Sequence, residues 1–373
     1  MQKKKIDYID NLRVLLMVLV VLHHSFITYG APGGWYYIEA TKKLGALIPM
    51  TLFVATNQSF FMGFFFFLSA LFIESSIIKK GSKIFMFDRL KRLGVPLVFY
   101  SLVFAPFLNW LVERFGSGNK ISFWNYLQVY HHWVSFGVLW FVAALLIFTC
   151  IYVLLRPLLN TSTDQSRLLP SNSRILLFAA CLGILSYLVR IIFPVGWTLR
   201  PLGFQPAHFS QYIALFILGI IASRNHWLDQ FDMKKARPFL RITLIMMFLV
   251  FPLLYVIKLV SGCSIDAFSG NGTYQSFLTA IWEQITGLSI MVFLLGYGRE
   301  KWNSQNSLLK KMSRSAYATY IFHPLIIISL ALSFKPVLVD PAFKLLFLGP
   351  LAVILSFLLG ELLVKIPGLN RIL

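Results

Sequence analysis

The sequence predicts an all-α integral membrane protein, a bundle of about ten transmembrane helices. Of its 373 residues, 58% are apolar and only 13% are charged, and the mean hydropathy is +0.73. So little polar surface cannot cover a water-soluble protein of this length. Apolar stretches of about 20 residues, the length that crosses a bilayer as a helix, also recur along the chain between short clusters of Lys and Arg.

We expect ten spans in a single membrane domain over residues 1–373, with nine and eleven as the alternative counts. The expected spans cover residues 12–30, 44–73, 93–112, 136–155, 175–193, 209–223, 239–258, 275–298, 315–333 and 345–364.

The first three spans follow from the charges around them. Span 12–30 comes after a basic start, and its apolar core is broken by His23 and His24. That break favours a retained helix over a cleaved signal peptide. Spans 44–73 and 93–112 lie between charges and contain none.

The next three spans differ in strength. Span 136–155 is free of charges and ends before Arg156, whereas span 175–193 contains Arg190 and span 209–223 is short for a bilayer.

The last four spans complete the bundle. Span 239–258 follows a basic cluster, span 275–298 carries Glu283 near its middle, and span 315–333 is free of charges. Span 345–364 closes the series.

The distribution of basic residues gives an orientation. The net charge of +20 would suit nucleic-acid binding, but with the N-terminus in the cytoplasm 24 of the 34 Lys and Arg fall in cytoplasmic segments. Only 9 fall in outer segments, and Arg13 lies inside the first span. This bias predicts cytoplasmic termini. It does not suit nucleic acid, whose binding requires basic residues on one face of a folded domain.

Cysteine chemistry and metal binding are not expected. Cys150 and Cys181 fall within spans, Cys263 lies alone in an outer loop, and no CxxC motif is present. We therefore place the activity inside the membrane bundle.

Arg13 and His24 share one face of the first span. They are 11 positions apart, which on an α-helix is three turns with about 20° over. Met17 and Val20 lie between them and make an apolar track about 16 Å long. The track would fit a ligand with an anionic end, a neutral arm and a reactive far end. Alternatively, Arg13 reaches cytoplasmic headgroups and His24 bonds a neighbouring helix.

Arg89 and Arg92 share a helical face at the cytoplasmic edge of the third span, and Lys91 lies between them. Guanidinium groups bind phosphates through paired hydrogen bonds. The alternative is an anchor of the kind that the general cytoplasmic bias produces.

Two further ionisable residues lie within spans, where a charge is costly unless it faces a cavity or a partner. His323 precedes Pro324, which cannot donate to the carbonyl of Tyr320 and tends to kink the helix there. A cavity wall and a structural bond both fit His323. We expect Glu283 to pair with His323 or with His24.

Aromatic residues gather in the outer segments. They either stack on sugar rings or form the ordinary interfacial belt, and we favour the belt. They include Trp35, Tyr36, Tyr37, Trp124, Tyr126, Tyr130, Trp133 and Trp197.

Five short motifs occur in a recognisable order. They are Asp10-Asn11-Leu12-Arg13 with His24 after ten intervening residues, the Phe-rich run 64–70, Arg89-x-x-Arg92 with Pro96 beyond, Leu139-Trp140-Phe141, and Tyr320-Ile321-Phe322-His323-Pro324. Together they resemble the acyltransferase-3 family of bacterial integral-membrane O-acyltransferases over essentially the whole chain. The short branch that modifies periplasmic glucans, which is similar to glucan succinyltransferases, is the nearest likeness.

The resemblance implies an enzyme of the bacterial inner membrane. It would move an acyl group, acetyl or succinyl, from cytoplasmic acyl-CoA to a hydroxyl of an extracytoplasmic carbohydrate, with no permanently bound cofactor. It implies His24 as the catalytic residue and Arg13, Arg89 and Arg92, with Lys91, as acyl-CoA-binding residues. Supporting positions are Ser69, Trp140, Glu283 and His323.

The sequence departs from the family pattern in two places. Ser69 is followed by Ala70 where the family commonly has Gly, which would restrict a close backbone approach. No fused extracytoplasmic domain follows, so we expect the acceptor to be reached directly. The alternative function is a secondary transporter or a lipid-linked sugar flippase, although the sequence shows neither a repeat nor paired midplane carboxylates.

Overall fold

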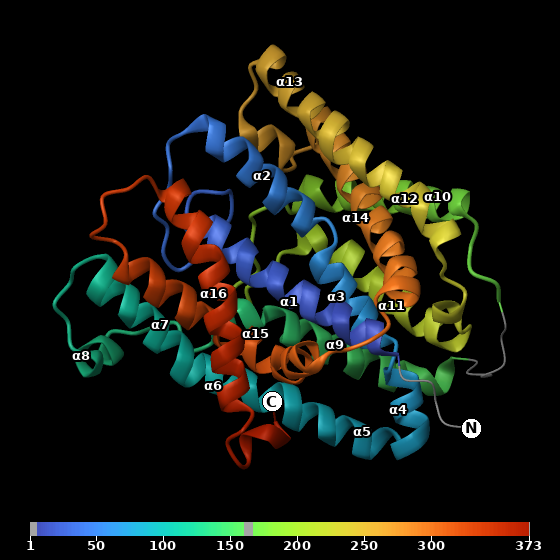
Figure 1. The fold of residues 1–373 in the computed structure, drawn as a ribbon, viewed down its shortest axis with the longest axis horizontal. Helices are drawn as coiled ribbons and strands as arrows, with labels where there is room; N and C mark the ends of the chain where they lie inside the picture. Colours follow the sequence, from blue (N-terminus) through green and yellow to red (C-terminus); the bar gives the residue numbers. More distant parts are fainter. Residues whose placement is uncertain (1–5, 160–166, 373) are drawn as a thin grey trace.

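The computed structural model describes residues 6–159 and 167–372, and within them the fold is an all-helical bundle (Figure 1). The α-helices are α1 (Asp7–Thr28), α2 (Leu44–Gln58), α3 (Phe61–Ala70), α4 (Ile73–Lys80), α5 (Ser82–Arg89), α6 (Val95–Phe99), α7 (Ala105–Leu111), α8 (Phe123–Gln128), α9 (Trp140–Leu155), α10 (Asn172–Ile192), α11 (Phe209–Arg224), α12 (Met233–Ile245), α13 (Phe251–Ser261), α14 (Tyr274–Lys301), α15 (Ser307–Ser333) and α16 (Pro341–Leu363).

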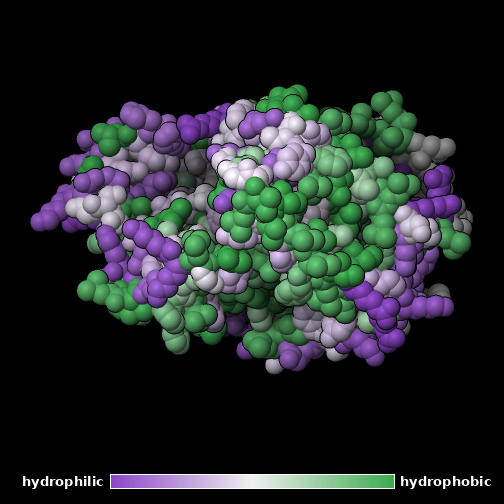
Figure 2. Space-filling model, turned by 90° about the horizontal axis from the view of Figure 1, so that it is seen from above, coloured by the Kyte–Doolittle hydropathy of each residue, from purple (hydrophilic) through white to green (hydrophobic). Residues whose placement is uncertain are grey.

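The predicted membrane architecture is confirmed. Ten helical segments in the described part of the chain are long and apolar enough to cross a bilayer, and each contains the core of one expected span. In Figure 2 the apolar side chains cover the middle of the molecule, and hydrophilic ones gather toward its left and right ends. This is a multi-pass membrane protein.

Several spans are joined from shorter helices, and prolines explain most of the joints. The third span consists of α5, α6 and α7 with π-helical turns between them, and the seventh consists of α12 and α13 with one such turn. Pro96, Pro106 and Pro252 each lie two residues after a π-helical turn. Proline has no N–H for the carbonyl four residues earlier, so the wider turn accommodates the missing bond.

Helix α1 runs through the middle of the bundle, against α2, α3, α14, α15 and α16 (Figure 1). Two glycines let backbones meet nearby. A Cβ on Gly287 of α14 would lie 2.0 Å from the carbonyl oxygen of Ser59, at the break between α2 and α3. A Cβ on Gly219 of α11 would lie 2.5 Å from the carbonyl of Phe67 and 2.8 Å from the Cβ of Ala70. The close approach at Ala70 is thus allowed by a glycine on the opposite helix.

Candidate active site

A large cavity opens at the end of the bundle where the chain begins and ends. We call it the arginine cavity. It has a volume of about 1830 Å³ and includes Ile6 and Asn370 in its lining. Its charged lining residues are Arg13, Lys80, Arg89, Arg92, Arg299 and Arg314, with Asp10, Asp88, Asp229 and Glu300. The cations outnumber the carboxylates, which favours an anionic ligand.

Arg13 is aimed into this cavity and not at lipid. Its Nη1 forms a 3.0 Å ion pair with Asp10 and its Nη2 donates to the carbonyl of Leu68 at 3.2 Å. The guanidinium also lies 5.0 Å from the centre of the Phe72 ring. The side chain is 34% exposed although α1 is central, because the cavity reaches it. Ser69, one residue after Leu68, lines the same cavity.

The two arginines of the third span join Arg13, but the lysine between them does not. Arg89 and Arg92 line the arginine cavity, and Arg92 lies over the ring of Tyr317 at 5.9 Å. The Tyr317 hydroxyl donates to the Arg92 carbonyl at 3.1 Å, which Pro96 has left without its helical donor. Lys91 is exposed outside the cavity lining, so its expected part in the site is not supported.

A second cavity lies beside the C-terminal half of α1. We call it the histidine cavity, because His23, His24, His132 and His208 line it. Its volume is about 950 Å³, and its lining in the described residues contains no Arg, Lys, Asp or Glu. Trp140 and Tyr212 form part of its wall and stack with ring centres 5.5 Å apart. This cavity suits a neutral ligand.

A hydrogen-bond chain fixes the protons of two imidazoles, the buried His323 and the partly buried His24. Pro324 has no N–H, which leaves the carbonyl of Tyr320 free, and the Nδ1 of His323 lies 2.8 Å from that oxygen. A carbonyl only accepts, so the His323 Nδ1 carries a proton and the Nε2 of the neutral ring accepts. The Nδ1 of His24 lies 3.0 Å from this Nε2 and must donate. The Nε2 of His24 therefore holds a lone pair, as a general base or a nucleophile requires.

The proline that frees this carbonyl can be tested directly. Pro324→Ala restores an N–H that competes with His323 for the Tyr320 carbonyl, and we expect kcat to fall roughly 3- to 10-fold, the worth of one ordinary hydrogen bond. Stability should stay equal or rise, because proline disfavours a helix interior. The measurements are kcat and thermal unfolding, and Pro350→Ala, inside α16, is the control. Full activity of Pro324→Ala would contradict the hydrogen-bond chain from Tyr320 through His323 to His24.

His23 takes no part in the hydrogen-bond chain of His24 and His323. Its Nδ1 lies 3.2 Å from the Nδ2 of Asn57 on α2, and its ring packs against Phe61. As the helical geometry predicts, the two neighbouring histidines point to different helices.

Aromatic residues expected in the interfacial belt belong partly to the site. Trp35 stacks on His24 with ring centres 4.0 Å apart, and Tyr36 and Tyr130 line the histidine cavity with it. The hydroxyls of Tyr36 and Tyr100 are 2.8 Å apart. Burial raises the pKa of Tyr36 to about 12, so this hydroxyl keeps its proton near neutral pH. These residues line a cavity inside the bundle, which the belt prediction did not anticipate.

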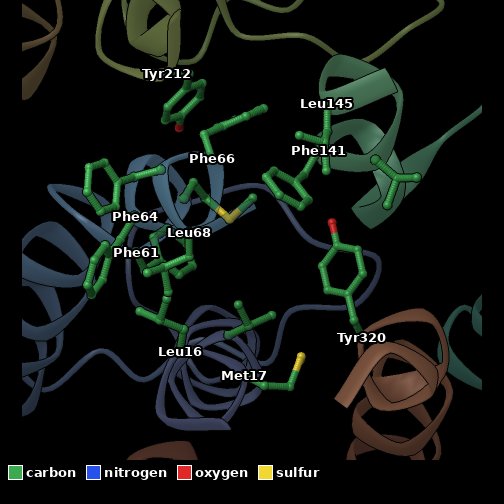
Figure 3. Packing of buried hydrophobic residues seen from close by; sticks show 14 of the residues in the cluster. Leu16, Met17, Phe61, Phe64, Phe66, Leu68, Phe141, Leu145, Tyr212 and Tyr320 are labelled. Carbon is green, nitrogen blue, oxygen red and sulfur yellow. The ribbon is translucent and has the colours of Figure 1, made fainter. Parts of the chain in front are cut away.

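The two cavities meet at Tyr320, which lines both. Met17 of α1 and Phe141 of α9 line the arginine cavity beside it, and Figure 3 shows the three side chains approaching one another from different helices. The rings of Phe141 and Tyr320 are 6.2 Å apart and nearly perpendicular. The Tyr320 hydroxyl donates to the carbonyl of Val138. A thin wall of apolar side chains thus separates the arginines from His24.

The prediction that Glu283 pairs with His24 or His323 was wrong. Glu283 of α14 forms a 2.6 Å ion pair with Arg190 of α10, and its other oxygen lies 3.1 Å from the Nδ1 of His208. All three side chains are buried. A charge in the hydrocarbon region of the bilayer is costly without a partner. The two opposite charges in separate spans could therefore have predicted this ion pair from the sequence. His208 was missed because it lies just before the short span and resembles a loop residue.

No group of three or more His, Cys, Asp or Glu in residues 6–159 and 167–372 is arranged to hold a metal ion. Comparison with known proteins adds a family. The family model described as an acyltransferase domain, of the acyltransferase-3 type, matches residues 6–361. Neither the curated proteins nor the solved structures gave a match. Because the family model covers nearly the whole chain, the protein belongs to the acyltransferase-3 family and is a membrane acyltransferase.

Proposed function

We propose that this protein moves a short acyl group, acetyl or succinyl, from cytoplasmic acyl-CoA to a hydroxyl of an extracytoplasmic carbohydrate, with periplasmic glucan as the first candidate. One observation carries the proposal. A basic cavity and a neutral histidine cavity meet at Tyr320, and α1 contributes Arg13 to one and His24 to the other. The positive-inside bias supports a cytoplasmic arginine cavity, in a bacterial inner membrane.

The order of groups in acyl-CoA matches the order of residues along this path. Its phosphates fit Arg89, Arg92 and Arg13, since guanidinium binds phosphate through paired, charge-assisted hydrogen bonds. Its neutral arm fits the apolar stretch past Met17, and its thioester then reaches His24. We propose that movement of the Met17 side chain, a flexible thioether, together with that of Tyr320 opens the wall.

Two routes use the lone pair on the His24 Nε2. In direct transfer this nitrogen takes the proton of the acceptor hydroxyl, the hydroxyl oxygen bonds to the acyl carbon, and the C–S bond breaks with its electron pair going to sulfur. In a relay the Nε2 itself bonds to the acyl carbon and expels the thiolate. The acceptor hydroxyl oxygen then bonds to the acyl carbon, the C–N bond breaks with its electron pair returning to Nε2, and the hydroxyl proton passes to the CoA thiolate. Trapping a labelled acyl-enzyme without acceptor would exclude the direct route.

The test of this function is the activity of the purified, reconstituted protein with a panel of acyl-CoA donors. We expect release of CoA from acetyl-CoA or succinyl-CoA with no solute gradient. No CoA release from any donor, together with movement of a solute across the vesicle membrane, would favour a transporter or a lipid-linked sugar flippase.

The arginines give a prediction with a neighbouring control. Arg89→Ala and Arg92→Ala should each raise the Kd for acyl-CoA roughly 10- to 100-fold, since each removes a charge-assisted contact. Lys91→Ala should leave this Kd unchanged, because Lys91 lies outside the cavity lining. Binding is measured by titration of the reconstituted protein. Unchanged affinity in both arginine variants would return these residues to a role as a membrane anchor.

A further inference from the structure

A second imidazole with a fixed proton lines the histidine cavity. His208 lies in the turn before α11, and its Nδ1 is 3.1 Å from Oε1 of Glu283, whose Oε2 is held by Arg190 at 2.6 Å. The Nη2 of Arg190 also lies 3.3 Å from this Nδ1, but the Glu283 oxygen is closer and only accepts hydrogen bonds, so we assign the proton to the His208 Nδ1, which donates to Glu283. In the neutral ring, the His208 Nε2 is left as an acceptor.

The buried ion pair serves to orient this ring. Arg190 also donates from Nε to the carbonyl of Ala207 at 3.3 Å, the residue before His208. Thus the charged pair holds both the imidazole and the backbone beside it. Burying two opposite charges stabilises a fold little beyond a well-packed apolar pair, so stability alone explains the arrangement poorly.

Two residues that line the same cavity carry a hydrogen-bond donor without an acceptor. The Nε1 of Trp35 and the hydroxyl of Tyr130 are buried atoms, and neither donates a hydrogen bond to an acceptor in the part of the chain that the structure describes. Buried polar groups are nearly always hydrogen-bonded, so these two point to a ligand with acceptor oxygens. Trp35 stacks on His24, which places such a ligand beside the reactive nitrogen.

We propose that His208 is a binding residue for the acyl acceptor, that Glu283 and Arg190 are its positioning residues, and that Trp35 and Tyr130 complete the acceptor site. The ligand class is a neutral polyhydroxylated molecule. One of its hydroxyls donates to the His208 Nε2, while others accept from Trp35 and Tyr130. The cavity lining is rich in aromatic rings and, among residues 6–159 and 167–372, holds no charged side chain, which fits such a ligand. This inference rests on the proposed acyl transfer and names the acceptor's contacts within it.

The test compares substitutions at His208 with one at His131, a histidine of the 129–136 segment that is exposed and lines neither cavity. His208→Ala and His208→Phe are made in the reconstituted protein. Both leave Glu283 paired with Arg190, and phenylalanine also keeps the ring volume. The steady-state rates are measured with a β-linked glucose oligosaccharide as the acceptor probe and with acyl-CoA as donor, together with thermal unfolding.

We expect both His208 variants to raise the KM for the oligosaccharide about 3- to 10-fold, the worth of one hydrogen bond to a neutral group. The KM for acyl-CoA should stay as in the wild type, and His131→Ala should change nothing. The unfolding temperature should fall in both His208 variants, because each leaves the Glu283 Oε1 without its partner. A purely structural role would change both KM values together.

Several results would overturn the assignment without touching the donor chemistry. One is an unchanged acceptor KM in both His208 variants, and another is wild-type protein that releases CoA from acyl-CoA but is not stimulated by the oligosaccharide. Absence of any CoA release from wild-type protein would instead overturn the proposed function itself.

Discussion

Replacing His24 with alanine is expected to abolish acyl transfer, with a loss of roughly 100- to 10,000-fold in kcat, the usual contribution of a general base. The cause is the loss of the Nε2 lone pair, which the contact with His323 leaves available. The variant should still fold, because the His24 side chain is only partly buried and its helix is held by five others. The measurement is transfer of labelled acyl groups by the reconstituted variant, with unfolding temperature recorded alongside.

His23→Ala is the matched control for this prediction. It removes the adjacent imidazole, which faces Asn57 and is no part of the His24 chain, and we expect a much milder loss. Full activity without His24, together with inactivity without His23, would reverse the assignment of the two faces of α1.

His323→Ala should have the second largest effect, a fall in kcat of roughly 10- to 100-fold, comparable with the loss of an outer-shell partner from a histidine ligand. Without the His323 Nε2, the Nδ1 of His24 loses its side-chain acceptor, and the ring is freer to adopt the other tautomer or turn away. The affinity for acyl-CoA should not change, because His323 does not line the arginine cavity. Comparison of kcat with the acyl-CoA Kd makes the test.

His323→Gln separates the hydrogen bond from the packing around it. Glutamine offers an oxygen that can accept from the Nδ1 of His24, so this variant should recover part of the lost kcat. If the alanine and glutamine variants both kept wild-type rates, His323 would have no catalytic part and its contact with His24 would be only structural.

The sequence predicted most of the bundle because a bilayer imposes a strong signal. Helices must satisfy all backbone hydrogen bonds internally, so each span was visible as an apolar stretch. Residues on one helix were also placed well relative to one another. Arg13 and His24 share a stripe by helical periodicity alone, and Met17 lies between them where the cavities meet.

Most contacts between helices could not be predicted from the sequence. Apolar surfaces that face lipid and those that face protein look alike, so the apolar pattern did not show that α10 and α14 are neighbours. Only the opposite charges of Arg190 and Glu283 in separate spans could have predicted their ion pair. The position of Trp35 in the histidine cavity could not be predicted for a similar reason, because an aromatic residue after the first span suits a membrane interface as well as a cavity. The position of Lys91 outside the cavity could have been predicted, since a residue between Arg89 and Arg92 points away from their shared helical face.

The most direct test of two cavities serving one transfer is the side from which acyl-CoA enters. Labelled acyl-CoA is added to sealed membrane vesicles of either orientation, inverted or right-side-out, carrying the wild-type protein or His24→Ala. We predict that CoA is released by inverted wild-type vesicles, by right-side-out vesicles only after permeabilisation, and by neither kind with His24→Ala. Equal release from both sealed orientations, or release that persists without His24, would contradict a donor path running from the arginine cavity to this histidine.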